Sequence, residues 1–151
     1  MAALSDDELA RRAALARAFS RHVPHNEALG MRLVELTATD VTFELPYDAR
    51  LAGNPDTGVL HGGVITALLD ATSGIAVFGA LAEPVPIATL DLRIDYLRPA
   101  EAGRTVRATA TCYRVTRHVA FTRAVAYHDD PADAVAHAVG TFMLSTKAGK
   151  A

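Results

Sequence analysis

The longest apolar stretch of the chain covers residues 63–81 and is hydrophobic nearly all round. A helix with this pattern is buried in the core of a domain, so a central helix is predicted there. Its polar residues follow i, i+4, i+7 spacing, which places Thr66, Asp70 and Ser73 on one face. Asp70 is the one charge in the stretch, and a buried carboxylate needs a partner or a function.

The segments before this stretch predict a helix and a hairpin. A capping box that begins at Ser5 predicts an amphipathic helix over 6–21. A turn over 26–30 follows. Apolar and polar residues then alternate in two short strands, 31–36 and 41–45.

The C-terminal half alternates with the period of strands. Short turns rich in Pro, Gly and Asp separate four predicted strands, which cover residues 90–96, 105–115, 119–127 and 134–145. The order of elements predicts a single α+β domain over 1–151. In this domain a curved antiparallel sheet wraps around the central helix, and a further helix lies at the N-terminus.

Composition narrows the classes of protein. The net charge of −2 argues against nucleic acid as a partner. Cys112 is the one cysteine, which excludes an intramolecular disulfide and fits the reducing cytoplasm, where we expect the protein to reside. The histidines show no ligand spacing, so no metal is expected. The charge of Asp70 argues against a membrane span at 63–81.

The stretch His61-Gly62-Gly63 opens the central helix, where unpaired N–H groups and a partial positive charge suit an oxyanion hole. A nearby carboxylate, Asp70, can act as a nucleophile or as a general base for water. Together these groups predict acyl transfer to water.

The spacing between His61 and Asp70 bears on subunit structure. Nine helical residues separate them by about 13 Å along the axis and by about 900° of rotation, on roughly opposite sides. The two residues therefore cannot meet within one subunit unless the chain bends sharply. A joint role predicts a dimer with two equivalent sites at its interface.

Each of these residues also has a purely structural interpretation. His61 can cap the helix, and Gly62 and Gly63 can shape a turn. Asp70 can be satisfied by Thr66, Ser73 or a backbone N–H. The pattern alone leaves both interpretations open.

Three motifs give the chain a resemblance to a known family. They are Gly-Val-Leu-His-Gly-Gly at 58–63, Ala-Leu-Leu-Asp at 67–70, and Thr-Leu-Asp-Leu-Arg-Ile-Asp-Tyr-Leu-Arg-Pro-Ala at 89–100, with Gly103 after them. Over about 29–144 the chain resembles the hotdog-fold acyl-CoA thioesterases of the PaaI type. The resemblance implies release of a carboxylic acid and CoA, with no metal and no cofactor beyond the CoA of the substrate.

The resemblance also implies roles for individual residues. Asp70 matches the catalytic carboxylate, and Gly62 the residue whose N–H polarises the thioester carbonyl. His61 matches a histidine that holds this region or the substrate, and Thr89 a residue that positions the attacking water. Relatives carry an asparagine six residues before the histidine. Asn54 lies seven before it, and a loop one residue longer would deliver it to the site.

Coenzyme A carries phosphates, for which arginine is the preferred ligand. The candidates are Arg98, Arg114 and Arg117. Gly63, with Thr66 and Ser73 on the polar face, completes the predicted substrate-binding set. The resemblance implies homodimers that pair into tetramers. The alternatives are a non-catalytic acyl-CoA-binding protein and a dehydratase acting on 3-hydroxyacyl thioesters.

Overall fold

The structure is a computed structural model that describes residues 5–145. Its helical segments are α1 (Asp6–His22), α2 (Pro24–Ala28), the 3-10 turn η1 (Ala49–Leu51) and α3 (Gly62–Ala80). Its strands are β1 (Arg32–Leu36), β2 (Asp40–Leu45), β3 (Ile87–Tyr96), β4 (Val106–Val115), β5 (Val119–Tyr127) and β6 (Ala134–Leu144).

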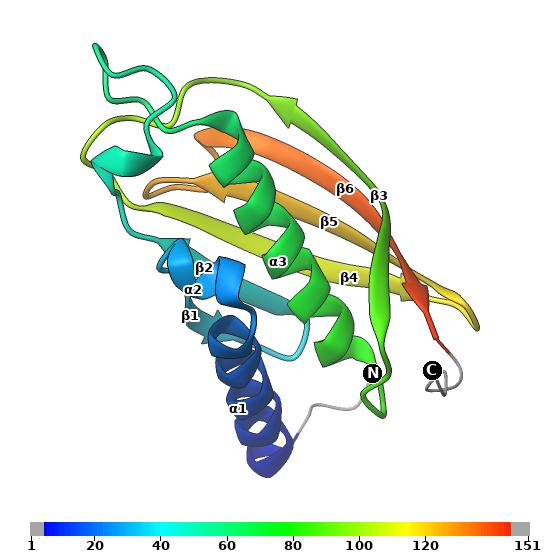
Figure 1. Ribbon diagram of the computed structural model, residues 1–151. Helices are drawn as coiled ribbons and strands as arrows, with labels where there is room; N and C mark the ends of the chain where they lie inside the picture. Colours follow the sequence, from blue (N-terminus) through cyan, green and yellow to red (C-terminus); the bar gives the residue numbers. More distant parts are fainter. Residues whose placement is uncertain (1–4, 146–151) are drawn as a thin grey trace.

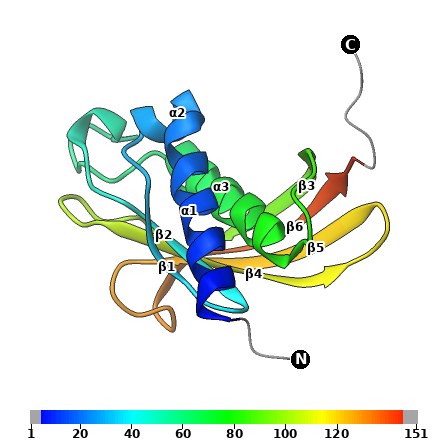
Figure 2. The same ribbon diagram turned by 90° about the horizontal axis from the view of Figure 1, so that it is seen from below.

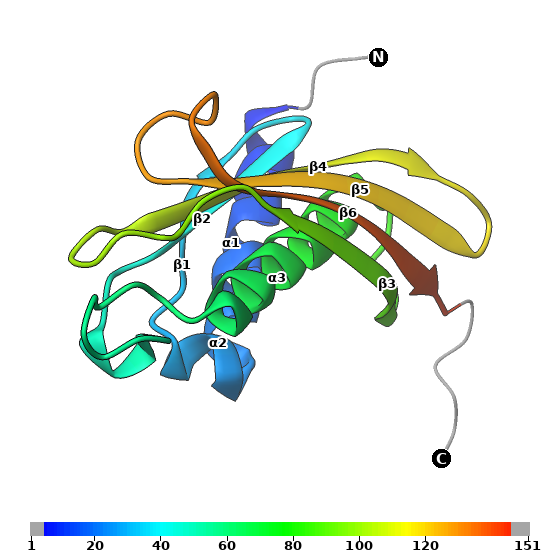
Figure 3. The same cartoon turned by 90° about the horizontal axis from the view of Figure 1, so that it is seen from above.

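The six strands form one antiparallel sheet in the order β1-β2-β4-β5-β6-β3. Strand β3 therefore lies at the edge beside β6, and α3 connects it with the β1–β2 hairpin at the opposite edge. The sheet curves around α3 (Figure 1). The views along the sheet show α1 and α3 on the same face (Figures 2 and 3). This arrangement confirms the predicted hotdog fold with an additional N-terminal helix.

The core lies between α3 and the inner face of the sheet. Leu68 and Leu69 of α3 are fully buried there. Two rows of paired alanines cross β4, β5 and β6 on this face, and their small side chains leave room for the bulky helix residues. The rows are Ala108, Ala126 and Ala136, and Ala110, Ala124 and Ala138.

Helix α1 begins as the capping box predicts, because the Ser5 hydroxyl accepts a hydrogen bond from the Glu8 N–H at 3.2 Å. The Glu8 carboxylate pairs with Arg11 and Arg12, whose hydrogen bonds lower its pKa to about 2. Ala16 is buried, and α1 packs against β1 and α3. The N-terminal helix ends one residue beyond the predicted 6–21.

The predicted turn at 26–30 is wrong at its start, because Pro24 opens the short helix α2. The fixed φ of proline suits the first residue of a helix, so Pro24 both separates α2 from α1 and starts it. The central helix occupies Gly62–Ala80 rather than 63–81. By length and composition it could cross a membrane, but 61% of its apolar window is buried inside the domain, as in a core helix.

The position of Leu68 predicts a large effect of truncation. Leu68→Ala should lower the free energy of unfolding by about 2–5 kcal/mol, because the cavity left between α3 and the sheet cannot collapse. Urea unfolding would measure the change. The control is Leu15→Ala on α1, whose side chain is 37% exposed and should cost less than about 1 kcal/mol. Equal losses in both variants would contradict the burial described.

Candidate active site

The start of α3 is held by His61 and by the loop before it. His61 is the N-cap residue, and its Nδ1 accepts a hydrogen bond from the Gly63 N–H at 2.9 Å. The backbone N–H of His61 donates to the Leu51 carbonyl at 2.9 Å. His61 therefore caps the helix, and the ring proton lies on Nε2, since Nδ1 is the acceptor.

Gly62, the first residue of α3, presents a backbone donor. Its N–H has no hydrogen-bond acceptor within the described part of the chain. Its carbonyl accepts from the Tyr96 hydroxyl at 2.8 Å, and that hydroxyl also contacts Thr66 Oγ1 at 2.6 Å. A Cβ on Gly62 would lie 3.5 Å from the Tyr96 ring. Tyr96 thus fixes the first turn of α3 and leaves the Gly62 N–H available.

Asp70 lies two turns further along α3, is half-buried, and faces the edge strand β3. Its Oδ1 accepts a hydrogen bond from Thr89 Oγ1 at 2.8 Å. Thr89 belongs to β3, next to a register shift between Thr89 and Asp91. Such a bulge re-aims side chains. Asp70 takes part in none of the ion pairs found within residues 5–145.

Asp70 and Thr89 line a cavity of about 730 Å³ whose walls are mostly apolar. The cavity runs along α3, with α1 and α2 on one side and β3 on the other. Its lining residues are Phe19, Val23, His25, Asn26, Gly63, Thr66, Ala67, Asp70, Ala71, Gly74, Phe78, Pro86, Ile87, Thr89, Leu92 and Phe142.

The sequence did not predict that α1 and α2 contribute residues to this cavity. Phe19 follows the apolar pattern of an outer helix, which gives no sign that it lines a cavity. Asn26 is only 6% exposed and lines this cavity. Because α2 itself was predicted as a turn, no signal in the sequence indicated that His25 and Asn26 would reach Asp70's cavity.

His61 lies outside that cavity. It lines a neighbouring hollow of about 330 Å³, together with Leu51 and Val64. Gly63 and His25 border both hollows. One chain therefore does not bring His61 into the same cavity as Asp70, in agreement with the helix geometry.

The other predicted site residues are placed as follows. Asn54 is exposed and lines neither hollow, and its Oδ1 accepts from the Asp56 N–H at 2.9 Å. Ser73 is 1% exposed and lies outside the cavity, and its Oγ has no hydrogen-bond partner within the described chain. Thr66 and Gly63 line the cavity.

The three candidate arginines differ in their surroundings. Arg98 forms ion pairs with Glu101 at 3.0 Å and with Asp133 at 2.9 Å. Arg114 and Arg117 are exposed near the β4–β5 turn, and no hydrogen bond or ion pair within residues 5–145 holds their guanidinium groups. These two are therefore free to bind an anion, whereas Arg98 is already paired.

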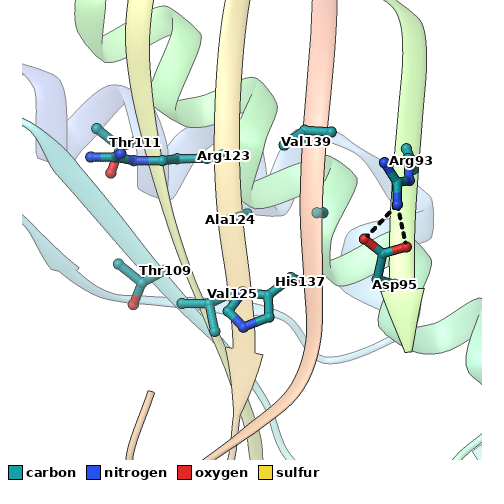
Figure 4. Close-up of a pocket in the computed structure, with 10 residues that line it drawn as sticks. Arg93, Asp95, Thr109, Thr111, Arg123, Ala124, Val125, His137 and Val139 are labelled. Atoms are coloured by element: carbon teal, nitrogen blue, oxygen red, sulfur yellow. Dashed lines mark hydrogen bonds and ion pairs between the residues drawn. The ribbon is translucent and has the colours of Figure 1, made fainter. Parts of the chain in front are cut away.

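A further hollow, of about 400 Å³, lies on the outer face of the sheet, away from α3. Figure 4 shows Arg93 paired with Asp95 at one side of it and Arg123 extending toward Thr111 at the other. None of the predicted site residues lines this hollow.

The fold and this site define the class of protein, and comparison with known proteins agrees. The profile of the thioesterase superfamily matches residues 57–135. The chain therefore belongs to the thioesterase superfamily. The medium/long-chain acyl-CoA thioesterase YigI of Escherichia coli is 32% identical over 139 residues, which cover 83% of this chain and 88% of YigI.

Solved structures agree with this assignment. A crystal structure of a Pseudomonas aeruginosa protein is 44% identical, with a TM-score of 0.81, and the match covers 89% of this chain and 99% of that one. A variant of the phenylacetic acid degradation protein PaaI from Thermus thermophilus is 28% identical, with a TM-score of 0.70, over 81% and 99%. The predicted hotdog thioesterase of the PaaI type is thus confirmed.

The cap formed by His61 predicts how two substitutions differ. His61→Ala should lower the free energy of unfolding by about 0.5–2 kcal/mol, because the Gly63 N–H loses its acceptor. His61→Asn should restore most of this loss, since asparagine is a preferred N-cap residue. Urea unfolding of both variants tests the cap. Equal destabilisation by alanine and asparagine would count against it.

Proposed function

We propose that the protein hydrolyses acyl-CoA thioesters to a free carboxylic acid and CoA. One observation carries the proposal: Asp70, the single carboxylate among the described residues that line a largely apolar cavity, is oriented by the Thr89 hydroxyl. The relative YigI, whose name states an acyl-CoA thioesterase activity, supports the substrate class.

The reaction follows from the groups described. Asp70 accepts a proton from water, whose oxygen attacks the thioester carbonyl, or its own oxygen attacks that carbon directly. Negative charge develops on the carbonyl oxygen, where the free N–H of Gly62 donates a hydrogen bond. In the first route the carbon–sulfur bond then breaks, and the proton held by Asp70 passes to the CoA thiolate. In the second route the same cleavage leaves the acyl group as a mixed anhydride on Asp70, the CoA thiolate takes a proton from water, and a further water molecule hydrolyses the anhydride to the free acid. Thr89 keeps Asp70 in position, and the chain's own groups and water suffice without a cofactor.

The site requires a second subunit, because Gly62 and Asp70 lie about 12 Å apart along one helix. Strand β3 supplies a suitable interface, since it is a sheet edge with unpaired backbone groups. Leu90 and Tyr96 on it, and Leu97 just after it, are each more than half exposed. Pairing of β3 with its copy would bring Gly62, His61 and the Asn54 loop of the partner subunit toward Asp70.

The same reasoning extends to CoA and to higher assembly. The exposed Arg114 and Arg117 suit the CoA phosphates, and Arg98 would act only if it left its two carboxylates.

On the outer sheet face Val139 and Met143 are nearly half exposed beside the charges of Arg93 and Asp95. This face suits the pairing of two dimers. A cytoplasmic location fits the single, unpaired Cys112.

Removal of the carboxylate tests the reaction. Asp70→Asn should lower kcat by about 100-fold or more and leave folding unchanged, since the amide retains the size of the side chain and can still accept from Thr89. Release of free thiol from acyl-CoA measures the rate. Burial raises the pKa of the Cys112 thiol, which keeps the protein's own contribution to the signal small.

The control for Asp70→Asn is Asp130→Asn, in the turn after β5, where either side chain can accept from the Ala132 N–H. Its rate should match that of the parent. Undiminished thiol release by Asp70→Asn would overturn the assignment.

Shared sites can be tested by mixing two inactive variants. Gly62→Pro removes the proposed donor at a position where proline is favoured, and His61 already has the extended backbone that precedes a proline. Gly62→Ala keeps the N–H and is the matched control. Gly62→Pro and Asp70→Asn should each be inactive alone. Refolded together they should regain about one quarter of the parent rate, because half of the dimers then hold one intact site.

No recovery on mixing would refute sites shared between subunits. High activity in Gly62→Pro alone would refute the role of its N–H.

A further inference from the structure

The cavity has two chemically different ends. At the N-terminal end of α3 it is bordered by Gly63, Thr66 and the exposed His25. Beyond Asp70, toward the C-terminal end, its walls are apolar and include Ile87 and Phe142. A thioester held at Asp70 would therefore direct its hydrocarbon chain toward the C-terminal end of α3, where apolar surface is available.

That apolar end has a definite floor and a definite stop. Gly74 forms the floor one turn beyond Asp70, and a Cβ there would lie 3.7 Å from Ile87 and 3.8 Å from Phe142. An aromatic pair lines the cavity beyond Gly74 and would form this stop: the rings of Phe19 and Phe78 have centroids 5.6 Å apart and are tilted by 59°. Phe19 comes from α1, so this helix contributes to the cavity wall.

The distance from the reacting carboxylate to this stop can be read along the helix. Eight residues separate Asp70 from Phe78, which at ~1.5 Å per residue is about 12 Å, roughly the length of an extended ten-carbon chain. Longer chains would meet the two rings.

We propose that Gly74 and the Phe19–Phe78 pair select the acyl chain by length: Gly74 keeps the channel open, and the ring pair ends it at medium-chain length. The inference rests on the proposed acyl-CoA hydrolysis and names the substrate class of the same cavity. It also gives α1 a function beyond packing, since Phe19 forms half of the stop.

Replacing Gly74 with a larger residue tests whether the channel selects the acyl chain by length. Gly74→Leu adds a side chain whose Cβ would make ordinary van der Waals contacts. Because Gly74 lines the cavity, the remaining carbons should occupy channel space. We expect kcat/KM for decanoyl-CoA to fall by about tenfold or more, while butanoyl-CoA changes by less than about threefold. Phe78→Ala should act in the opposite direction and raise the relative rate on chains of 14 and 16 carbons.

Gly79→Leu is the matched control. It makes the same change in the same helix, but Gly79 borders other hollows beside α1 and not this cavity. Both leucines replace a helical glycine and so favour the helix to a similar extent. The chain-length profile of Gly79→Leu should equal that of the parent.

The outcomes separate the inference from the proposed function. If the parent hydrolyses none of a series of saturated acyl-CoAs from 4 to 16 carbons, the proposed function fails. If the parent is active and Gly74→Leu lowers all chain lengths equally, or leaves the profile unchanged, the length-selecting channel is refuted. A selective loss of long chains in Gly74→Leu, with none in Gly79→Leu, would establish it.

Discussion

The close packing of α3 on the alanine rows of the sheet determines the rest of the structure. Alanine is the smallest side chain that still forms a regular strand surface, so the helix approaches closely and its leucines fill the space between. A larger residue in either row would force the helix outward. Because the helix cannot shift, the residues on its opposite face have fixed positions too.

This packing also sets the rotation of the helix, and with it the direction of Asp70. Leu68 and Thr72 lie two residues before and after Asp70, each about 200° around the helix axis. Both are fully buried. Asp70 must then point away from the central strands and into the cavity beside β3. Its partner Thr89 arrives from β3, which reaches the sheet edge only because α3 carries the chain across the inner face.

The same rotation explains why the polar face predicted on α3 divides in two. Thr66 and Asp70 border the cavity, whereas Ser73, about 60° back around the axis from Asp70, is buried. Spacing along a helix places residues on one face, but the curvature of the sheet decides how much of that face is covered. The sequence around His61 was compatible with a helix cap or with a role in the site. The structure shows that His61 caps the helix.

The sequence by itself determined the elements other than the short helices before and after the first hairpin, the central helix with its lone carboxylate, and the glycines at the helix start. Periodicity and local chemistry encode these features, and they lie within a few residues of one another. The resemblance implied a role for Thr89, but only the tertiary structure decided what contacts Asp70 and its cavity: the hydrogen bond from Thr89, 19 residues away, Phe19 from α1, and Asn26 from a helix that was predicted as a turn. Contacts between distant segments depend on how the whole sheet folds around α3, and no local pattern records that.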